Sequence, residues 1–151
     1  VLLYQPEIPP NTGNAIRLCA NTGARLHLIK PLGFELEDKQ LRRAGLDYHE
    51  YATLQVHDSL QAALDTIAPQ RLFALSTRGT QRYDQPRYRD GDAFLFGPET
   101  RGLPTDVLDN LPPEQRLRLP MRPGNRSLNL SNSIAVVVFE AWRQMDFAGG
   151  A

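Results

Sequence analysis

Four segments of this 151-residue chain are rich in glycine, asparagine, serine and arginine, as ligand-binding loops often are. They read EIPPNTGNAIR from residue 7, LSTRGT from residue 75, GPETRGL from residue 97 and PMRPGNRSLNLSN from residue 120. Glycine lets a backbone approach a ligand closely, and the guanidinium fork of arginine matches phosphate oxygens. The segments therefore predict a ligand held largely by backbone groups, with arginine available for phosphate.

Several common catalytic and binding motifs are missing from the sequence. It contains no GxGxxG dinucleotide fingerprint, no GxxxxGK[ST] phosphate loop and no GxSxG nucleophile elbow. His27, His49 and His57 have no carboxylate or cysteine partner at metal-ligand spacing, and Cys19 is the only cysteine. We therefore expect no metal, no hydrolytic triad and no internal disulfide, and we interpret His27 and Cys19 as buried structural residues.

The charge balance excludes a strong overall attraction to polyanions. Seventeen basic and seventeen acidic residues give a net charge of +0, so any binding of nucleic acid must come from a local patch. Only Lys30 and Lys39 are lysines, and the other basic residues are arginines. This bias has two interpretations, the codon usage of a GC-rich genome and the binding of phosphate.

The chain has the length of one domain, and we expect residues 1–151 to form it. Its longest apolar runs, residues 134–139 and 93–96, are far shorter than the roughly 18 residues of a membrane span, so no membrane contact is expected. A signal-like segment is also missing, which makes the cytoplasm the expected compartment.

The elements that would position the four segments follow an alternating pattern of short apolar runs and helical periodicities. This pattern is typical of an α/β domain with a mainly parallel sheet flanked by helices. Strands are expected over residues 1–4, 26–29, 51–56, 72–76, 93–96 and 117–119. Helices are expected over residues 11–21 (capped by Asn11 or Thr12), 38–44, 59–68 (capped by Asp58 or Ser59), 104–111 and 131–145 (capped by Ser131 or Asn132). Ligands of open α/β sheets bind beyond the carboxyl ends of the strands, where the four segments fall.

The last helix is apolar on two sides. One stripe consists of Ile134, Val137, Val138, Ala141 and Met145, and the other of Ala135, Val136, Phe139 and Trp142. A helix of this kind is either central to a single subunit or packed against a second one. We expect the second arrangement, a homodimer.

Three stretches of the sequence resemble the three motifs of SPOUT-class (TrmH-like) RNA ribose 2′-O-methyltransferases. They are NTGNAIRLCANTGA, LFGPETRGLP and LPMRPGNRSLNLSNSIAVVVFEAWRQ, and the resemblance covers nearly the whole chain. PEIPPNTGN and RRAGLDYHE bring it close to the members that modify the wobble nucleotide of tRNA. The resemblance implies the SPOUT fold, an α/β domain whose C-terminal segment forms a deep trefoil knot.

The resemblance also implies the cofactor S-adenosyl-L-methionine, which would leave as S-adenosyl-L-homocysteine. Backbone groups of three loops would hold it in the knot. Mapped by motif, the cofactor-binding residues are Leu75, Ser76, Thr77, Gly97, Gly102, Leu119, Met121, Ser127 and Leu128. We expect Gly97 and Gly102 to allow a close backbone approach, unless they only serve turns with positive φ.

The catalytic residues implied by the resemblance are Arg17, Asn11, Glu99 and Asn129. A ribose hydroxyl is a poor nucleophile near neutral pH, so it needs a base or a strong electrostatic field. Arg17 would either give up a proton transiently or stay charged and stabilise the developing alkoxide. Glu99 would accept hydrogen bonds from the substrate, orient Arg17 or cap its loop, and Asn129 would contact the cofactor or the ribose.

The expected substrate is the nucleotide at the tRNA wobble position, 34, which is a cytidine or a modified uridine. Phosphate contacts are assigned to six arginines, each with a solvated surface role as the alternative: Arg42, Arg43, Arg78, Arg82, Arg122 and Arg126. Two other functions are weighed against this one. The chain could be an inactive RNA-binding protein of the same fold, or a methyltransferase that acts on rRNA.

Overall fold

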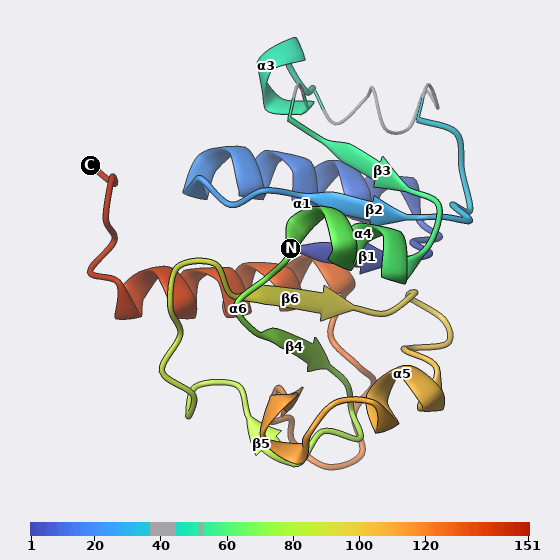
Figure 1. Ribbon diagram of the computed structural model, residues 1–151, viewed down its shortest axis with the longest axis vertical. Coiled ribbons are helices and arrows are strands. Elements are labelled where there is room, and N and C mark those ends of the chain that lie inside the picture. The colour runs from blue at the N-terminus through green and yellow to red at the C-terminus, as the bar shows by residue number, and fades with distance from the viewer. Residues whose placement is uncertain (37–44, 52) are drawn as a thin grey trace.

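The computed structural model describes residues 1–36, 45–51 and 53–151, and its strands form a single sheet (Figure 1). The strands are β1 (Leu2–Tyr4), β2 (His27–Ile29), β3 (Gln55–His57), β4 (Leu72–Leu75), β5 (Gln81–Arg82), β6 (Ala93–Phe96) and β7 (Arg116–Arg118). Their order across the sheet is β3-β2-β1-β6-β4-β7-β5, and every pairing is parallel. The α/β class and the mainly parallel sheet predicted from the sequence are confirmed.

The helices lie on both faces of this sheet. They are α1 (Pro9–Thr22), α3 (Tyr48–Tyr51), α4 (Leu60–Ile67), α5 (Thr105–Asp109) and α6 (Leu130–Gln144), with a 3-10 turn at Pro113–Gln115. The helices α1 and α6 pack side by side against one face, while α4 and α5 cover the other (Figure 1). None of the helices in the described part of the chain is long and apolar enough to cross a membrane.

The sheet is buried on both faces because its central strands are apolar throughout. Leu3 belongs to the core under α1 and α6, whereas its neighbour Leu2 belongs to the core under α4 and α5. All four residues of β6 are buried. Parallel strands covered on both sides have this continuous apolar character, and their alternate side chains supply the two cores.

Two helix starts differ from the sequence prediction. The helix α1 begins at Pro9, and its N-cap is Ile8, which offers no side-chain cap. Proline suits the first turn because its missing N–H would have no partner there. The cap of α6 is Asn129, whose side chain accepts a hydrogen bond from the Ser131 backbone. The predictions of Asn11 or Thr12, and of Ser131 or Asn132, as caps are therefore wrong, whereas Ser59 caps α4 as predicted.

Other differences concern short elements. Residues 77–92 were expected as a loop, but they contain β5, which pairs with β7 through only two residues. The helix α3 was not predicted, and β3 begins at Gln55, later than expected. The helix predicted over residues 38–44 lies outside the described residues.

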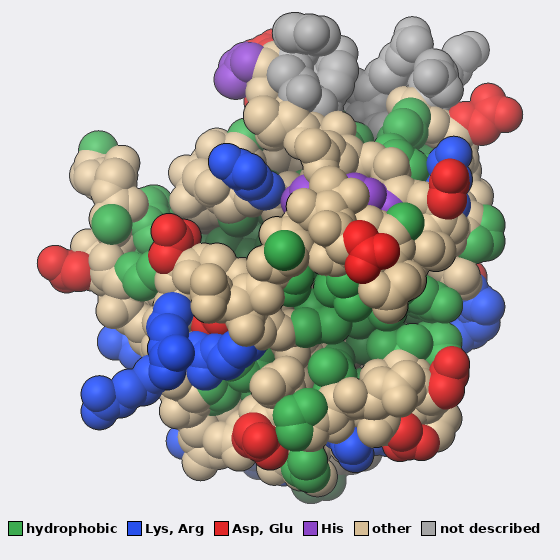
Figure 2. Space-filling model, viewed as in Figure 1, with side chains coloured by type: hydrophobic (Ala, Val, Ile, Leu, Met, Phe, Trp, Pro, Cys, Tyr) green, Lys and Arg blue, Asp and Glu red, His purple; other side chains and the backbone are tan. Residues whose placement is uncertain are grey.

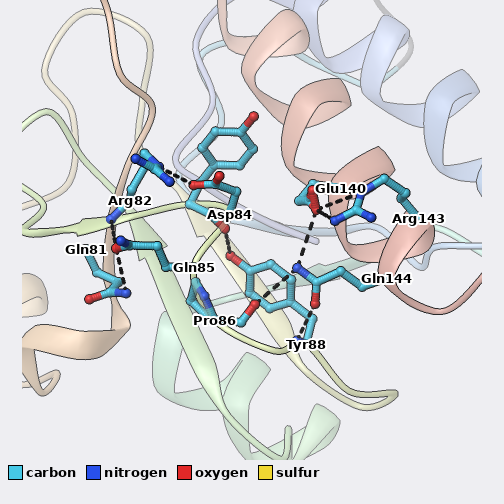
Figure 3. Close-up of polar contacts among 10 residues, drawn as sticks. Gln81, Arg82, Asp84, Gln85, Pro86, Tyr88, Glu140, Arg143 and Gln144 are labelled. Carbon is cyan, nitrogen blue, oxygen red and sulfur yellow. Dashed lines mark hydrogen bonds and ion pairs between the residues drawn. The ribbon is translucent and has the colours of Figure 1, made fainter.

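The segment that follows β5 is attached to the last helix (Figure 3). The Gln144 side chain accepts a hydrogen bond from Tyr88 N at 2.9 Å and donates one to Pro86 O at 3.1 Å. The Tyr88 hydroxyl donates to the Tyr83 carbonyl, and the Tyr88 ring packs edge-on against Phe73 and Phe94. This segment is thereby fixed between the sheet and α6.

Candidate functional site

A pocket of about 490 Å³ lies beyond the carboxyl ends of β4, β6 and β7. Three loops and the start of α1 form its walls. The loops follow these three strands in turn, which is where open α/β sheets bind their ligands. All nine residues assigned to the cofactor line this pocket: Leu75, Ser76, Thr77, Gly97, Gly102, Leu119, Met121, Ser127 and Leu128. The structure thus brings them together, and their contact with a cofactor stays a prediction.

The two glycines of the middle loop serve different purposes. A Cβ on Gly97 would lie 2.5 Å from Leu103 N and 2.6 Å from Gly102 C, so the loop can fold back on itself only because Gly97 has no side chain. Gly102 has a φ of +69°, and a Cβ there would meet nothing within 4 Å. The left-handed backbone of Gly102 favours glycine by itself, and the close approach to a ligand expected for this residue stays a prediction.

Three of the four predicted catalytic residues form one hydrogen-bonded chain at the pocket wall. Asn11 Nδ2 donates to Glu99 Oε2 at 3.3 Å, and Asn129 Nδ2 donates to Asn11 Oδ1 at 3.0 Å. The Asn129 Oδ1 atom accepts from the Ser131 backbone at 2.9 Å and from its hydroxyl at 2.6 Å. The chain joins residues of three separate segments and fixes the orientation of both amides, since each oxygen and each nitrogen has a defined partner.

Glu99 also holds the start of α1. Its carboxylate accepts hydrogen bonds from Glu7 N at 2.9 Å and from Ile8 N at 2.6 Å. A carboxylate is favoured at a helix N-terminus because unpaired N–H groups and the helix dipole both attract negative charge. A residue about 90 positions away thus accepts the N–H groups of the two residues that precede α1.

Arg17 is not brought to the pocket within one chain. Its Nε lies 3.2 Å from Glu50 Oε2, and its Nη2 donates to Gly45 O at 2.7 Å. It lies six residues after Asn11 on α1, which places the two side chains about 120° apart around the helix axis. The grouping of Arg17 with the other three residues, drawn from sequence motifs, does not hold in this geometry, and its catalytic role stays a prediction.

The predicted phosphate contacts are dispersed. Arg78 lines the pocket, but its guanidinium donates to Thr105 Oγ1 at 2.8 Å and to Leu103 O at 2.9 Å. Arg82, the last residue of the edge strand β5, is paired with Asp84 (Figure 3). Arg122 and Arg126 are exposed in the loop before α6, while Arg42 and Arg43 lie outside the described residues. In Figure 2, basic and acidic side chains are interspersed over the visible face, in keeping with the balanced composition.

The sequence interpretation missed several residues of the pocket wall, and one of them, Arg101, is charged. Arg101 lines the pocket and is exposed, and its Nη2 donates to Gln5 Oε1 at 3.2 Å. The signal was present, because Arg101 stands between Glu99 and Gly102 in a segment already identified as ligand-binding. No group of three or more metal-ligating side chains gathers within the described parts of the chain.

The comparison with protein families agrees with this arrangement. The model of the "SpoU rRNA Methylase family" matches residues 1–139. The chain belongs to this family. Two similar curated relatives are both named tRNA (cytidine(34)-2′-O)-methyltransferase. The one from Methylovorus glucosotrophus is 66% identical over 99% of this chain and 97% of its own length. The one from Escherichia coli K12 is 60% identical over 99% of this chain and 95% of its own length.

Solved structures with a similar fold are also methyltransferases. An RNA methyltransferase from Bacillus anthracis superposes with a TM-score of 0.88 at 43% identity, covering 99% of this chain and 95% of its own. A structure described as giving insights into "the 2-OH methylation of C/U34 on tRNA" has a TM-score of 0.87 at 48% identity. The match covers 96% of this chain and 94% of its own. The AdoMet complex of AviRb from Streptomyces viridochromogenes shares the fold, with a TM-score of 0.82 at 21% identity over 99% of this chain and 58% of its own. The SPOUT-class resemblance is thereby confirmed.

Proposed function

We propose that this SpoU-family chain transfers a methyl group from S-adenosylmethionine to the ribose 2′-hydroxyl at position 34 of tRNA. The relatives named for this activity match it over almost their entire lengths. The observation that carries the proposal is the convergence of all nine predicted cofactor residues on one pocket, together with Asn11, Glu99 and Asn129. The nucleotide modified is a cytidine or a modified uridine.

The pocket has the properties that the cofactor requires. Its walls combine apolar side chains, including Leu75, Leu119 and Leu128, with backbone groups of loops that contain glycine. An adenine needs an apolar slot and a few hydrogen bonds of defined direction, and such loops supply both. When bound, S-adenosylmethionine supplies the electrophilic methyl group, and the protein supplies orientation and proton handling.

The polar chain at the pocket wall would orient the ribose. Glu99 presents a carboxylate and Asn129 an amide at fixed positions, because their partners hold both groups in place. A preorganised polar wall of this kind reduces the entropy lost when the hydroxyl is aligned for in-line attack. This arrangement supports substrate contact by Asn11, Glu99 and Asn129.

We assign Arg17 the role of a cation that stabilises the developing alkoxide. Its partners in the free chain, Glu50 and Gly45, both accept hydrogen bonds and suit a charged guanidinium. The hydroxyl proton then leaves to a substrate phosphate or to water. Arg17 lies outside the pocket. This role therefore requires its side chain to leave the carboxylate of Glu50 and to contact the substrate instead.

Transfer of labelled methyl groups tests the proposal. Purified protein is incubated with labelled S-adenosylmethionine and total tRNA or rRNA, and the modified nucleotide is mapped. Label at tRNA position 34 is expected. Label only in rRNA would identify an rRNA methyltransferase, and no label in either pool would identify an inactive RNA-binding protein. Arg17→Ala is expected to abolish transfer while calorimetry shows unchanged cofactor binding, and a loss of that binding would contradict the assigned role.

The proposal extends to the assembly of the molecule. The helix α6 buries Ile134, Val137, Val138 and Ala141 within the chain, as predicted for one apolar stripe, although Met145 is exposed. From the second stripe, Val136 is 39% and Phe139 44% exposed. This exposed stripe supports a homodimer. Light scattering on the purified protein should give a dimer mass, and Phe139→Glu should give a monomer of unchanged circular dichroism.

Membership of the family and the position of two arginines support the remaining parts of the proposal. A deep trefoil knot in the C-terminal segment accords with SPOUT-class neighbours that cover nearly all of this chain. The cytoplasm is the compartment in which a tRNA-modifying enzyme meets its substrate. Of the predicted phosphate contacts, Arg122 and Arg126 stand in the loop that carries the pocket residues Met121 and Ser127, which supports their role in tRNA binding.

A further inference from the structure

The carboxylate of Glu7, which does not line the pocket, holds a residue that does. Its Oε1 accepts hydrogen bonds from Thr100 N at 2.9 Å and from Thr100 Oγ1 at 2.8 Å, and its Oε2 lies 3.0 Å from the same hydroxyl. Thr100 belongs to the middle loop of the pocket, between Glu99 and Arg101. Glu7 was not among the residues that the sequence motifs assigned to the site.

The contact between these two segments is reciprocal. While Glu7 accepts from Thr100, the preceding residue Glu99 accepts from the backbone of Glu7 and Ile8. We call this set of contacts between residues 7–8 and 99–100 the two-way clasp. Each of its bonds involves a carboxylate, and such charge-assisted bonds are stronger than bonds between neutral groups.

The charge on Glu7 persists at neutral pH. The Thr100 backbone N–H and hydroxyl lower the pKa of Glu7 below its usual value, and Arg101 acts in the same direction. The carboxylate therefore remains an acceptor under all conditions in which the enzyme would be assayed.

The clasp bears directly on the middle loop of the pocket. This loop leaves β6 at Gly97 and returns at Gly102 and Leu103, where its own backbone is packed too closely for a side chain on Gly97. Its ends are thus fixed by packing, whereas its tip, Glu99 and Thr100, is held by contacts with residues 7–8 and with Asn11. Without the Glu7 carboxylate, Thr100 would lose its bonds to residue 7, whereas Glu99 would keep its bonds to the backbone of residues 7–8 and to Asn11.

We propose that Glu7 is a positioning residue of the methyl-transfer site, which holds Thr100 and thereby the loop that receives S-adenosylmethionine. This inference rests on the proposed function for the identity of the ligand. Glu7 acts through Thr100, so its effect is expected on cofactor binding and not on the chemistry of the ribose.

Calorimetric titration of S-adenosylmethionine into variants of the full chain provides the test. Glu7→Ala is expected to weaken binding about tenfold, because a flexible loop tip must be ordered when the ligand binds. Glu7→Gln is expected to stay within about threefold of the parent protein, since its amide oxygen can accept both bonds from Thr100. Glu35→Ala removes an exposed glutamate from the loop after β2 and is the control, with unchanged affinity expected.

A coupling experiment separates positioning from a general loss of stability. Thr100→Val removes the hydroxyl and keeps the backbone N–H, so binding should weaken about threefold. The double variant with Glu7→Ala should bind no more weakly than Glu7→Ala alone, because both changes break the same contact. In steady-state assays the KM for S-adenosylmethionine should rise, while kcat and the KM for tRNA stay within about twofold. A merely destabilised protein would lose active molecules without a change in KM.

Three results would overturn the inference: parental affinity in Glu7→Ala, a failure of Glu7→Gln as severe as that of Glu7→Ala, or additive effects in the double variant. If Glu7→Ala does not fold, the affinity of Thr100→Val for S-adenosylmethionine is the deciding measurement. Parental affinity in that variant would overturn the inference. The proposed function fails differently, since a parent chain that binds S-adenosylmethionine but methylates no tRNA would refute the function and leave the role of Glu7 intact.

Discussion

Glu99 combines two tasks that are usually separate. Its carboxylate satisfies backbone N–H groups at the start of α1, and the same carboxylate accepts the amide of Asn11 at the pocket wall. Helix stabilisation and site geometry thus depend on one side chain. A change at this residue would therefore be hard to interpret, and residues with a single task make clearer tests.

Gly97 is such a residue. Gly97→Ala would place a Cβ 2.5 Å from Leu103 N, which is backbone and cannot swing aside. We expect the loop to shift, with a loss of about 2 kcal/mol in the free energy of unfolding and a loss of S-adenosylmethionine binding. Urea denaturation and calorimetry measure the two effects.

Gly102→Ala is the matched control in the same loop. Its Cβ would meet nothing within 4 Å, so the cost is only that of the left-handed backbone, about 1 kcal/mol. A Gly97→Ala protein as stable as Gly102→Ala would show that the close approach at Gly97 is unimportant.

Thr12 is a position at which a substitution should stabilise the protein. Its side chain is fully buried in α1, and its Oγ1 has no hydrogen-bond partner within the described structure. Thr12→Val replaces the hydroxyl by a methyl group of similar size and removes a desolvated polar atom. We expect an increase of about 1 kcal/mol in the free energy of unfolding, measured by urea denaturation.

Thr22 provides the contrast at the other end of the same helix, since its Oγ1 donates to Leu18 O at 2.9 Å. Thr22→Val should be neutral or destabilising. Equal effects at the two positions would contradict the interpretation of Thr12 as an unsatisfied group.

At the scale of elements, α6 is started by a residue that also belongs to the site. Asn129→Ala removes the cap of α6 and the bond to Asn11. We expect the free energy of unfolding to fall by about 1–2 kcal/mol and methyl transfer to be lost. Asn129→Asp should retain the stability, because aspartate caps helices well, but it cannot donate to Asn11 and should still lose activity.

Asn125→Ala is the control for this pair. Asn125 lies in the same loop, and among the described residues its side chain reaches only the Arg122 carbonyl, at 3.3 Å. A change within about 0.5 kcal/mol is expected, since exposed side chains away from caps contribute little. A full loss of stability in Asn129→Asp would show that the bond to Asn11, and not the cap, stabilises α6.

The elements that sequence predicted well are those with a local pattern. The apolar run of β6 and the periodicity of α4 with its Ser59 cap sufficed to place both. The start of α1 was misjudged because its acceptor is Glu99, a residue whose proximity only the folded sheet creates. Strand β5 has only two residues, which is too short for a hydrophobic pattern. It is a strand because it pairs with β7, and the sequence of β5 alone does not predict that pairing.

The same reasoning explains what was predictable at the site. Loop residues such as Ser127 were found because parallel strands bring their carboxyl ends to one edge, whatever the details of packing. The place of the Arg17 side chain and the contact of Glu7 with Thr100 could not be predicted, because side-chain direction decides both. Motif proximity on one helix placed Arg17 near Asn11, but the turn of the helix separates them.

For the molecule as a whole, stability should depend on pH through two histidines that join β2 to β3. His27 Nδ1 and His57 Nε2 are 3.0 Å apart. Burial, with nearby positive charges including His57, lowers the pKa of His27 from 6.5 to about 4. Between these values the unfolded chain binds the proton and the folded chain does not, so stability falls as pH falls through this window.

We expect the free energy of unfolding to drop by about 2 kcal/mol between pH 7 and pH 5, measured by urea denaturation. His27→Gln should flatten this dependence. The lowered pKa of Glu7 lies below this range, so Glu7 contributes little to the change. An equal slope in the parent and the variant would show that His27 is not the group responsible.

The bond between Asn11 and Asn129 spans 118 residues of the chain. The lining of the pocket extends even further along the sequence, from Ile8 to Ser133. A ribosome must therefore have released nearly the whole polypeptide before the cavity exists, and a nascent chain has no place to hold the methyl donor. Incomplete products of translation would be inert toward RNA modification, so this activity itself reports that synthesis has reached the last helix.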